Sequence, residues 1–558
     1  MSKRPPSGGT SEAAKRPAIE QGCGNGADSV ANRQLEKWLQ AEEAVFDNVD
    51  VVEVGPDSRK LVAKVAVEKD SVLIKLPTRC LIFVPPLFKT AETLPQEVEP
   101  QSDWWNAETV AYKHPIAGVT ERQKVLADTI RRACKNTDDA HSKTVIDILK
   151  NDFQQGHSLF LWLELLVAKH DPRHPWAIFV QSLPREAPQP ISWSTESRLL
   201  LQDTNLYKTN EATREKLQLV FDQIACPVIA DHAVLFPGLA TASQGLCVTI
   251  DDFLWARGVQ ISRSFPPTFC QVPWSTVGCM LPLVDMMNHP AIGIKSNTYL
   301  KVCASSGLTL RAATAVAEGD ELLYDYGAKS NDQFMFSYGF CLADNPANTM
   351  PIRLTASRPA AQRGEDLVLQ NYLVCCQREL FSRLKVPFEI RESQQQLLYS
   401  LGPVHVPPLE QGGDEVLQRL LYAVALLGAE AEDVELLVNA SAEPCNAASG
   451  STEEGGDSHR RPIAWAVQNP RNFPLPTPAD ARPTWAQAVV KFDPSSEDVE
   501  HLFSVVAAVA HPYQARLSEI LTNSSSAAPH HQQLCATYIR GNLAIAVSAL
   551  QALQQLRE

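Results

Sequence analysis

The alternation of hydrophobic and polar positions near the start of the chain predicts β-strands. Residues 61–67 and 71–76 both have a period of two, and the turn sequence Glu-Lys-Asp separates them. This pattern predicts a β-hairpin. A second period-two region predicts a three-strand meander, with strands at 298–304, 308–313 and 321–326.

The remaining hydrophobic positions mostly follow the spacing of helices. Residues 157–170 are the plainest example between about 86 and 250. A capping box at 249–252 predicts the start of another helix, and residues 330–333 cap a short helix that Gly339 can terminate. Beyond about residue 350 the pattern is helical throughout, as at 366–384, 415–427 and 500–520.

Composition divides the chain further. Residues 1–30 are rich in Gly, Ser, Pro and Ala and predict a disordered tail. Two basic pairs in this tail have the spacing of a bipartite nuclear signal, although a simple solubilising tail fits equally well. Residues 441–485 hold seven Pro, three Gly and four Ser, which predicts a linker. The predicted organisation is therefore a domain at 45–345 with a helical insert at about 86–250, then a helical lobe at 350–558.

The charge and cysteine pattern exclude several classes of protein. The 558 residues carry a net charge of −14, which argues against direct nucleic-acid binding over a large surface. The thirteen cysteines lack the spacing of a zinc site, so we expect no metal. No apolar stretch reaches the roughly 20 residues that span a bilayer, and no apolar leader begins the chain. We expect no membrane association and a cytoplasmic or nuclear protein.

Polar groups suited to chemistry gather at two places. The apolar segment 281–289 ends in Asp285, Asn288 and His289, where side chains can leave a core. Tyr324 and Tyr326 lie two residues apart, so in a strand both point to one face. A plain structural explanation also fits these residues, namely a turn before a proline and two half-buried sheet tyrosines.

Taken together, these segments resemble the two halves of a SET-domain active site. The first half is the Asp-x-x-Asn-His sequence at 285–289. The second, within 319–340, is a Gly-Asp-Glu turn, a Tyr-Gly-Ala-Lys-Ser-Asn segment and a final Tyr-Gly-Phe. The branch that they resemble is the Rubisco large-subunit lysine methyltransferase. Weaker similarities to that branch occur at 253–265, 159–184 and 538–541.

The resemblance implies a fold and an activity. The fold class is α+β: a β-rich SET fold interrupted by a helical insert, followed by an all-helical C-terminal substrate-binding lobe. The activity is methyl transfer from S-adenosylmethionine to a nitrogen of a protein side chain, most often lysine. Histidine methylation and a degenerate SET fold that only binds a partner are the alternatives. The net acidity would suit a basic protein substrate.

The resemblance also implies roles for individual residues. Tyr326 matches the catalytic tyrosine and also contacts the cofactor. The other residues matched to the cofactor site are Arg263, Phe265, Asn288 and His289. The residues matched to the channel for the target side chain are Ser262, Asp285 and Tyr338.

One stretch departs from the family pattern. The family's first motif is a Gly-x-Gly loop, whereas residues 57–63 here contain no glycine. We assign Asp57 and Arg59 of this stretch to the cofactor site. Either Arg59 or Lys60 can reach the cofactor carboxylate, or the stretch partly blocks the pocket and the chain only binds a partner.

Overall fold

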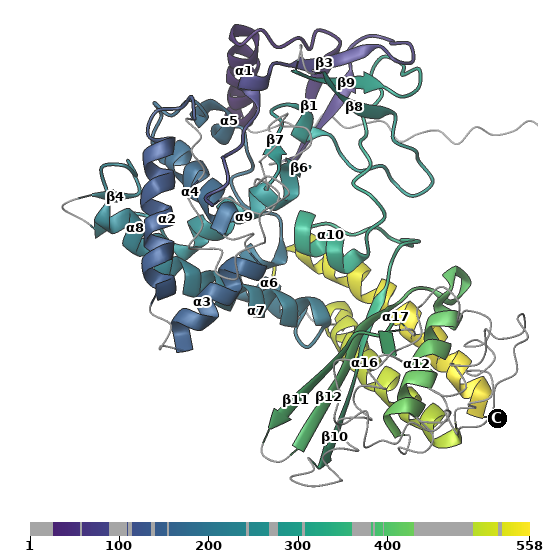
Figure 1. Ribbon diagram of the computed structural model, residues 1–558. Coiled ribbons are helices and arrows are strands. Elements are labelled where there is room, and N and C mark those ends of the chain that lie inside the picture. Colours follow the sequence, from purple (N-terminus) through teal and green to yellow (C-terminus); the bar gives the residue numbers. More distant parts are fainter. Residues whose placement is uncertain are drawn as a thin grey trace, which may run out of the picture. The chain divides into compact units, whose positions relative to one another are not determined.

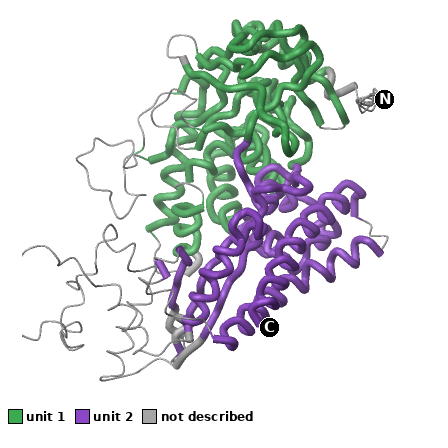
Figure 2. The backbone as a smooth tube through the Cα atoms, turned by 90° about the vertical axis from the view of Figure 1, so that its right-hand side faces the viewer, with its two compact units in different colours: residues 1–187, 219–325 green, residues 188–218, 326–558 purple. Residues whose placement is uncertain are grey.

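The computed structural model divides into two compact units (Figure 2). The first unit contains residues 1–187 and 219–325, and the second contains 188–218 and 326–558. The structure describes residues 26–55, 58–88, 109, 114–135, 140–152, 156–241, 245–266, 277–303, 307–359, 381–382, 385–393, 396–428, 495–522 and 527–557.

The strands of the first unit form small antiparallel sheets (Figure 1). Strand β1 (Val49–Gly55) pairs with β2 (Ser58–Ala63). Strand β3 (Val72–Leu76) pairs instead with β9 (Gly307–Ala312), which also pairs with β8 (Thr298–Cys303). The predicted hairpin of 61–67 with 71–76 is therefore wrong. A period of two specifies a half-buried strand but not its partner, and here both partners lie elsewhere in the chain.

The predicted meander is half right. Strands β8 and β9 are confirmed, but residues 321–326 form no strand beside them. Glu321 and Leu323 instead make isolated bridges to Val62 and Asn288. The backbone N–H of Leu322 donates to Leu61 O at 2.8 Å, so this segment joins β2 rather than β9.

Helices fill the insert, as predicted. Helix α4 (His157–His170) has the predicted bounds and is buried along most of its length. Helix α9 (Ile250–Arg263) begins at the predicted capping box, in which Thr249 and Asp252 bond reciprocally. The further helices here are α2 (Val119–Lys135), α3 (Ala140–Asn151), α5 (Ala177–Gln181), α6 (Thr195–Leu199), α7 (Asn205–Val220) and α8 (Cys226–Asp231).

The amino-terminal region contains one further helix, α1 (Gly26–Ala41). The disordered tail predicted for residues 1–30 is therefore wrong for its last five residues, which are helical. The small or polar residues at 26–29 give no helical pattern in the sequence. The apolar face of α1 begins only later, with Leu35 and Leu39, which are fully buried. The rest of the predicted tail lies outside the described residues.

A buried ion pair stabilises the helical insert. Arg122 of α2 donates to both carboxylate oxygens of Glu164 on α4, at 2.6 and 2.7 Å. The side chains are 5% and 0% exposed. Burial raises the pKa of Glu164, but the bonds and charges of His174 and Arg122 outweigh burial and hold this pKa below its ordinary value.

The second unit contains a sheet that the sequence did not predict. Strands β10 (Met350–Pro359), β12 (Gln396–Val406) and β11 (Phe388–Ser393) lie side by side in that order, all antiparallel. The prediction of an all-helical lobe beyond 350 is therefore wrong for these three strands, whereas the α+β class is confirmed. Buried and exposed residues alternate at 352–355 and again at 404–406, but each run is too short to identify a strand in the sequence.

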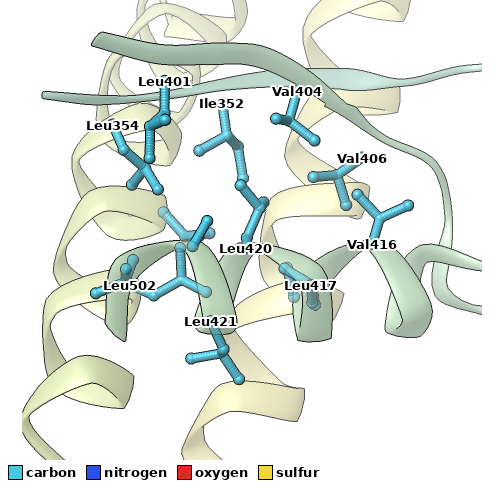
Figure 3. Packing of buried hydrophobic residues seen from close by; sticks show 14 of the residues in the cluster. Ile352, Leu354, Leu401, Val404, Val406, Val416, Leu417, Leu420, Leu421 and Leu502 are labelled. Carbon is cyan, nitrogen blue, oxygen red and sulfur yellow. The ribbon is translucent and has the colours of Figure 1, made fainter. Parts of the chain in front are cut away.

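Helices cover one face of this sheet (Figure 1). They are α12 (Gly413–Gly428), α16 (Ser496–Thr522) and α17 (Pro529–Arg557), which confirm the helices predicted at 415–427 and 500–520. Side chains from the sheet meet those of α12 and α16 in one core (Figure 3). The residues predicted as helix at 366–380 and as linker at 441–485 lie outside the described residues.

The compact units and the predicted domains divide the chain at different places. The second unit contains residues 188–218 and the chain from Tyr326 onward, whereas the predicted lobe starts only at 350. Within this unit, Gln189 Nε2 donates to Ser337 O at 2.8 Å. A SET domain at 45–345 with a lobe at 350–558 stays a proposal. Among the described helices, none is long and apolar enough to cross a membrane.

The Arg122–Glu164 pair predicts a large cost for removing one charge. Glu164→Gln leaves Arg122 buried without its counter-charge, so the free energy of unfolding should fall by about 3 kcal/mol. Urea titration followed by circular dichroism measures this change. Asp128→Asn, which breaks the exposed pair with Arg131 at 2.8 Å, is the control and should cost less than about 0.5 kcal/mol. Equal losses in both variants would contradict the stabilising role of the buried pair.

Candidate functional site

Asn288 connects three parts of the first unit. Its Nδ2 donates to Arg59 O at 3.2 Å and to Glu321 Oε1 at 2.9 Å, and its carbonyl accepts from the backbone of Tyr324 at 3.0 Å. The side chain of Asn297 supports the same segment, because it bonds the backbone of both Glu321 and Leu323 at 2.8 Å. The Asn288 side chain is therefore held in one orientation.

Arg263 lies at the end of α9 and is anchored on one side. Its Nη1 donates to the carbonyl of Asp285 at 3.0 Å and to Oδ2 at 3.1 Å. Within the described part of the chain, its Nε and Nη2 groups have no recorded partner, and the side chain is 18% exposed. Arg263 therefore presents a fixed guanidinium edge that can take a carboxylate.

Asp285 is buried and forms an ion pair with Arg263. Its side chain is 1% exposed, and its Oδ1 has no hydrogen-bond partner among the described residues. Burial raises the pKa of Asp285, while the charges of Arg263 and Arg59 oppose this rise. The side chain thus positions Arg263, and the role in the target channel that the resemblance implied stays a prediction.

Phe265 and Tyr324 form a half-buried aromatic pair. Phe265 follows α9 in β6 (Ser264–Phe265), which pairs with β7 (Cys279–Met280). The two ring centroids lie 5.6 Å apart at an interplanar angle of 59°. Burial raises the pKa of Tyr324, with a smaller effect from Asp325. The pair offers an apolar surface of the kind that accepts a flat heterocycle.

Arg59 is buried and faces α1. Its Nη1 donates to Asn32 Oδ1 at 2.7 Å, and Asn32 Nδ2 donates to Glu53 Oε1 at 3.1 Å. Lys60 is half-buried and lies opposite Val52 in the β1–β2 ladder. Of these two basic residues, Arg59 is the one whose positive charge opposes the rise in the pKa of Asp285. Asp57 lies outside the described residues.

His289 and Ser262 make contacts of their own. His289 Nδ1 lies 3.7 Å from Asp325 Oδ1. Ser262 donates its hydroxyl proton to Gly258 O at 2.8 Å, so it bonds back to its own helix. Neither contact includes Arg263 or Asn288.

The second unit holds Tyr326, which matches the catalytic tyrosine, and Tyr338, which matches the lining of the target channel. Tyr326 stacks on Tyr338 with ring centroids 4.8 Å apart and an angle of 25°. Phe340 meets Tyr326 edge-on at 6.3 Å. Tyr338 ends helix α10 (Asn331–Tyr338), which begins at the predicted Ser330 capping box. The prediction that Tyr324 and Tyr326 share one face of a strand is wrong, because residues 324–326 do not form a strand.

Gly339 terminates α10, as predicted. It adopts a left-handed conformation with φ of 76°. A side chain there would meet Pro188 O at 2.3 Å, so only glycine fits. This close approach fixes the end of the helix that carries Tyr338.

Sequence reasoning missed two contributors, Asn32 and Asn297. Asn32 lies 27 residues before Arg59, and Asn297 lies 26 residues before Leu323. Neither residue belongs to a motif that we identified. Only the amphipathic pattern of residues 30–41 could have indicated that a helix carries Asn32.

Comparison with known proteins places these observations in a family context. No protein-family model matches the chain. The chain is 27% identical over 208 residues to the chloroplastic fructose-bisphosphate aldolase-lysine N-methyltransferase of Arabidopsis thaliana, covering 35% of this chain and 40% of that protein. It is 27% identical over 213 residues to the chloroplastic ribulose-1,5 bisphosphate carboxylase/oxygenase large subunit N-methyltransferase of Nicotiana tabacum, covering 37% and 41%. An actin-histidine N-methyltransferase of Danio rerio is 24% identical over 202 residues, covering 36% and 32%.

The fold agrees with these relatives. A crystal structure of the SET domain of LSMT bound to lysine and AdoHcy matches with a TM-score of 0.51 at 16% identity, covering 94% of this chain and 91% of that one. The predicted resemblance to the Rubisco lysine methyltransferase branch of SET-domain proteins is therefore confirmed. The chain spans less than half the length of each curated relative named above.

The raised pKa of Asp285 predicts a pH dependence of stability. The folded protein holds this proton more tightly than the unfolded chain, whose carboxyl has a pKa of about 3.9. Stability is therefore lost as the pH rises from that value through the raised folded value. Asp285→Asn lacks this loss, so its unfolding free energy relative to wild type should increase with pH and then level off.

Urea titrations of both proteins from about pH 4 to about pH 8 measure this difference. A difference that instead decreases with rising pH would show that the ion pair with Arg263 outweighs burial, which would reverse the assignment.

Proposed function

We propose that the chain is a protein-lysine N-methyltransferase that uses S-adenosylmethionine. The observation that carries the proposal is the Arg263 guanidinium, held on one side by Asp285, two residues before Phe265 in the chain. Phe265 in turn packs on Tyr324. A cationic edge and an aromatic surface this close in the chain suit a ligand with a carboxylate at one end and a purine at the other. The relative from Arabidopsis thaliana, a lysine N-methyltransferase, supports the same activity.

The residues of the first unit fit this cofactor. Unused N–H groups of Arg263 would hold its carboxylate, and the Phe265–Tyr324 pair would contact its purine. Asn288 would fix the nearby backbone, since its side chain already joins β2 to Glu321. When bound, S-adenosylmethionine supplies an electrophilic methyl group. The role of the protein is to position the acceptor nitrogen and to keep it neutral.

A lysine acceptor must lose its proton before it can react. With an ordinary pKa of about 10.4, neutralising it at pH 7.4 costs about 4 kcal/mol. A site with little water lowers this cost, because desolvation disfavours the ammonium form. Tyr326, whose ring is fixed by its stack on Tyr338, would orient the amine through its hydroxyl. These roles of Tyr326 and Tyr338 rest on their match to the family motif.

Histidine methylation is the second candidate, and the relative from Danio rerio favours it. A neutral imidazole has a pKa near about 6.5, so deprotonation costs little at neutral pH. The initial rate would then level off above about pH 7. A lysine acceptor instead predicts a rate that keeps rising as the pH approaches the amine pKa.

A third possibility is a SET fold that binds a partner without catalysis. The observation in its favour is that residues 57–63 contain no glycine where the family has a Gly-x-Gly loop, and that Arg59, between the two expected glycine positions, donates to Asn32. For the partner, the net charge of −14 favours a basic target protein. We propose that the protein acts in the cytoplasm or the nucleus.

Tyr326→Phe tests the proposal in a transfer assay. The variant and wild type are incubated with methyl-labelled S-adenosylmethionine and a lysate of the source organism, and labelled bands are identified by mass spectrometry. Because Phe keeps the ring stack but removes the hydroxyl, labelling should fall about a hundredfold or more while folding is unchanged.

Tyr399→Phe is the matched control, since Tyr399 also packs on another ring, that of Phe388, but belongs to β12 and not to the candidate site. It should retain more than half of the wild-type labelling. If Tyr326→Phe retains as much labelling as this control, Tyr326 has no role in transfer. If the wild-type protein labels no protein but remains folded, the binding-module alternative is favoured.

Arg59→Ala and Lys60→Ala should differ in cofactor affinity. Arg59 is buried, and its charge reaches Asp285, the anchor of Arg263, whereas Lys60 lies in the β1–β2 ladder. Removing Arg59 should weaken binding of S-adenosylhomocysteine about tenfold, and removing Lys60 by less than about twofold. Isothermal titration calorimetry measures both constants. Equal effects would show that the replaced loop does not influence the cofactor site.

A further inference from the structure

Side chains of three consecutive residues hold the backbone of Leu323 in the first unit. The N–H of Leu323 donates to Asn297 Oδ1 at 2.8 Å. Its carbonyl oxygen accepts from the Thr298 hydroxyl at 2.7 Å and from the Ser296 hydroxyl at 2.8 Å. Residues 296–298 therefore form a clamp on the backbone of Leu323.

Thr298 is the most firmly placed member of this clamp. Its side chain is 5% exposed, whereas Ser296 and Asn297 are half-buried. Thr298 begins β8 and lies opposite Ala312 of β9, so the sheet fixes its backbone. The Ser296 hydroxyl also lies 3.0 Å from the carbonyl of Thr298, and its single proton is shared between two acceptors. Thr298 is therefore the principal donor to the Leu323 oxygen.

The clamp determines the orientation of the peptide group that joins Leu323 to Tyr324. This group is planar and contains the carbonyl of Leu323 and the N–H of Tyr324. The clamp bonds its oxygen, and its N–H donates to Asn288 O at 3.0 Å. Because both ends of one rigid plane are bonded, the direction in which the Tyr324 side chain leaves the backbone is fixed. That side chain packs on Phe265.

We infer that Thr298 is a positioning residue of the cofactor site and acts through Tyr324. This inference rests on the proposed function, in which the Phe265–Tyr324 pair contacts the purine of the cofactor. A ring whose backbone is held before binding loses less freedom when the ligand arrives. Removing the Thr298 hydroxyl should therefore weaken binding, although the hydroxyl itself touches no part of the ligand.

A purely structural role of the Thr298 hydroxyl predicts a different result. In that case, its removal would lower the free energy of unfolding and leave the affinity of the folded protein unchanged. Calorimetric titration with S-adenosylhomocysteine, well below the unfolding temperature, measures the affinity of folded protein alone. It therefore separates the two roles.

Thr298→Val and Thr298→Ser form the test pair. Valine keeps the shape of threonine and suits a strand but has no hydroxyl, so the dissociation constant of S-adenosylhomocysteine should rise about fivefold. Serine keeps the hydroxyl and should restore affinity to within about twofold of wild type. Thr309→Val is the matched control. Thr309 is 7% exposed in β9 and donates its hydroxyl to Lys301 O at 3.2 Å, so its loss should leave binding unchanged.

A double-mutant cycle tests whether Thr298 acts through Tyr324. Tyr324→Leu keeps an apolar side chain, and adding Thr298→Val to it should change the affinity by less than about twofold. The inference is overturned by wild-type affinity in Thr298→Val, by an equal loss in Thr309→Val, or by a fivefold loss that persists beside Tyr324→Leu. No binding of S-adenosylhomocysteine by the folded wild-type protein would instead contradict the proposed function, and this inference with it.

Discussion

The hydrogen bonds of residues 321–324 are the contacts on which the candidate site of the first unit depends. They join this segment to Leu61 of β2 and to Asn288, which are more than 200 residues apart in the chain. Such distant pairing costs entropy, and it persists because Leu61 and Leu322 are fully buried. This connection, together with the bond from Asn288 Nδ2 to Arg59 O, fixes Arg59 and Asn288 relative to each other.

A second constraint follows from the burial of charge. Asp285 is held away from water, so its carboxylate is stable only beside Arg263 and the more distant Arg59. The same contact that satisfies Asp285 also immobilises Arg263 and leaves part of its guanidinium available. Because Arg263 is already immobilised, it can bind an anion with little further loss of side-chain entropy. The ion pair that stabilises the fold therefore also prepares Arg263 for binding.

Local signals in the sequence predicted local structure well. The capping boxes at Thr249 and Ser330 are both present, because the side chain and backbone groups that form them lie within four residues. Strand partners were not predictable, since the hydrophobic patterns of β2 and β3 do not indicate which strand each one pairs with. The motif resemblance located Arg263 and Asn288. It could not reveal that Asp285 is buried, because burial depends on the packing of residues distant in sequence.

The central claim is that these connected segments form one cofactor-binding half-site. Hydrogen exchange with and without S-adenosylhomocysteine tests it most directly. The account predicts that the ligand slows exchange of backbone amides at 58–63, 263–265, 285–289 and 321–324 together, since one set of hydrogen bonds holds them. Unchanged exchange in all four segments of the folded protein at saturating ligand would contradict the account.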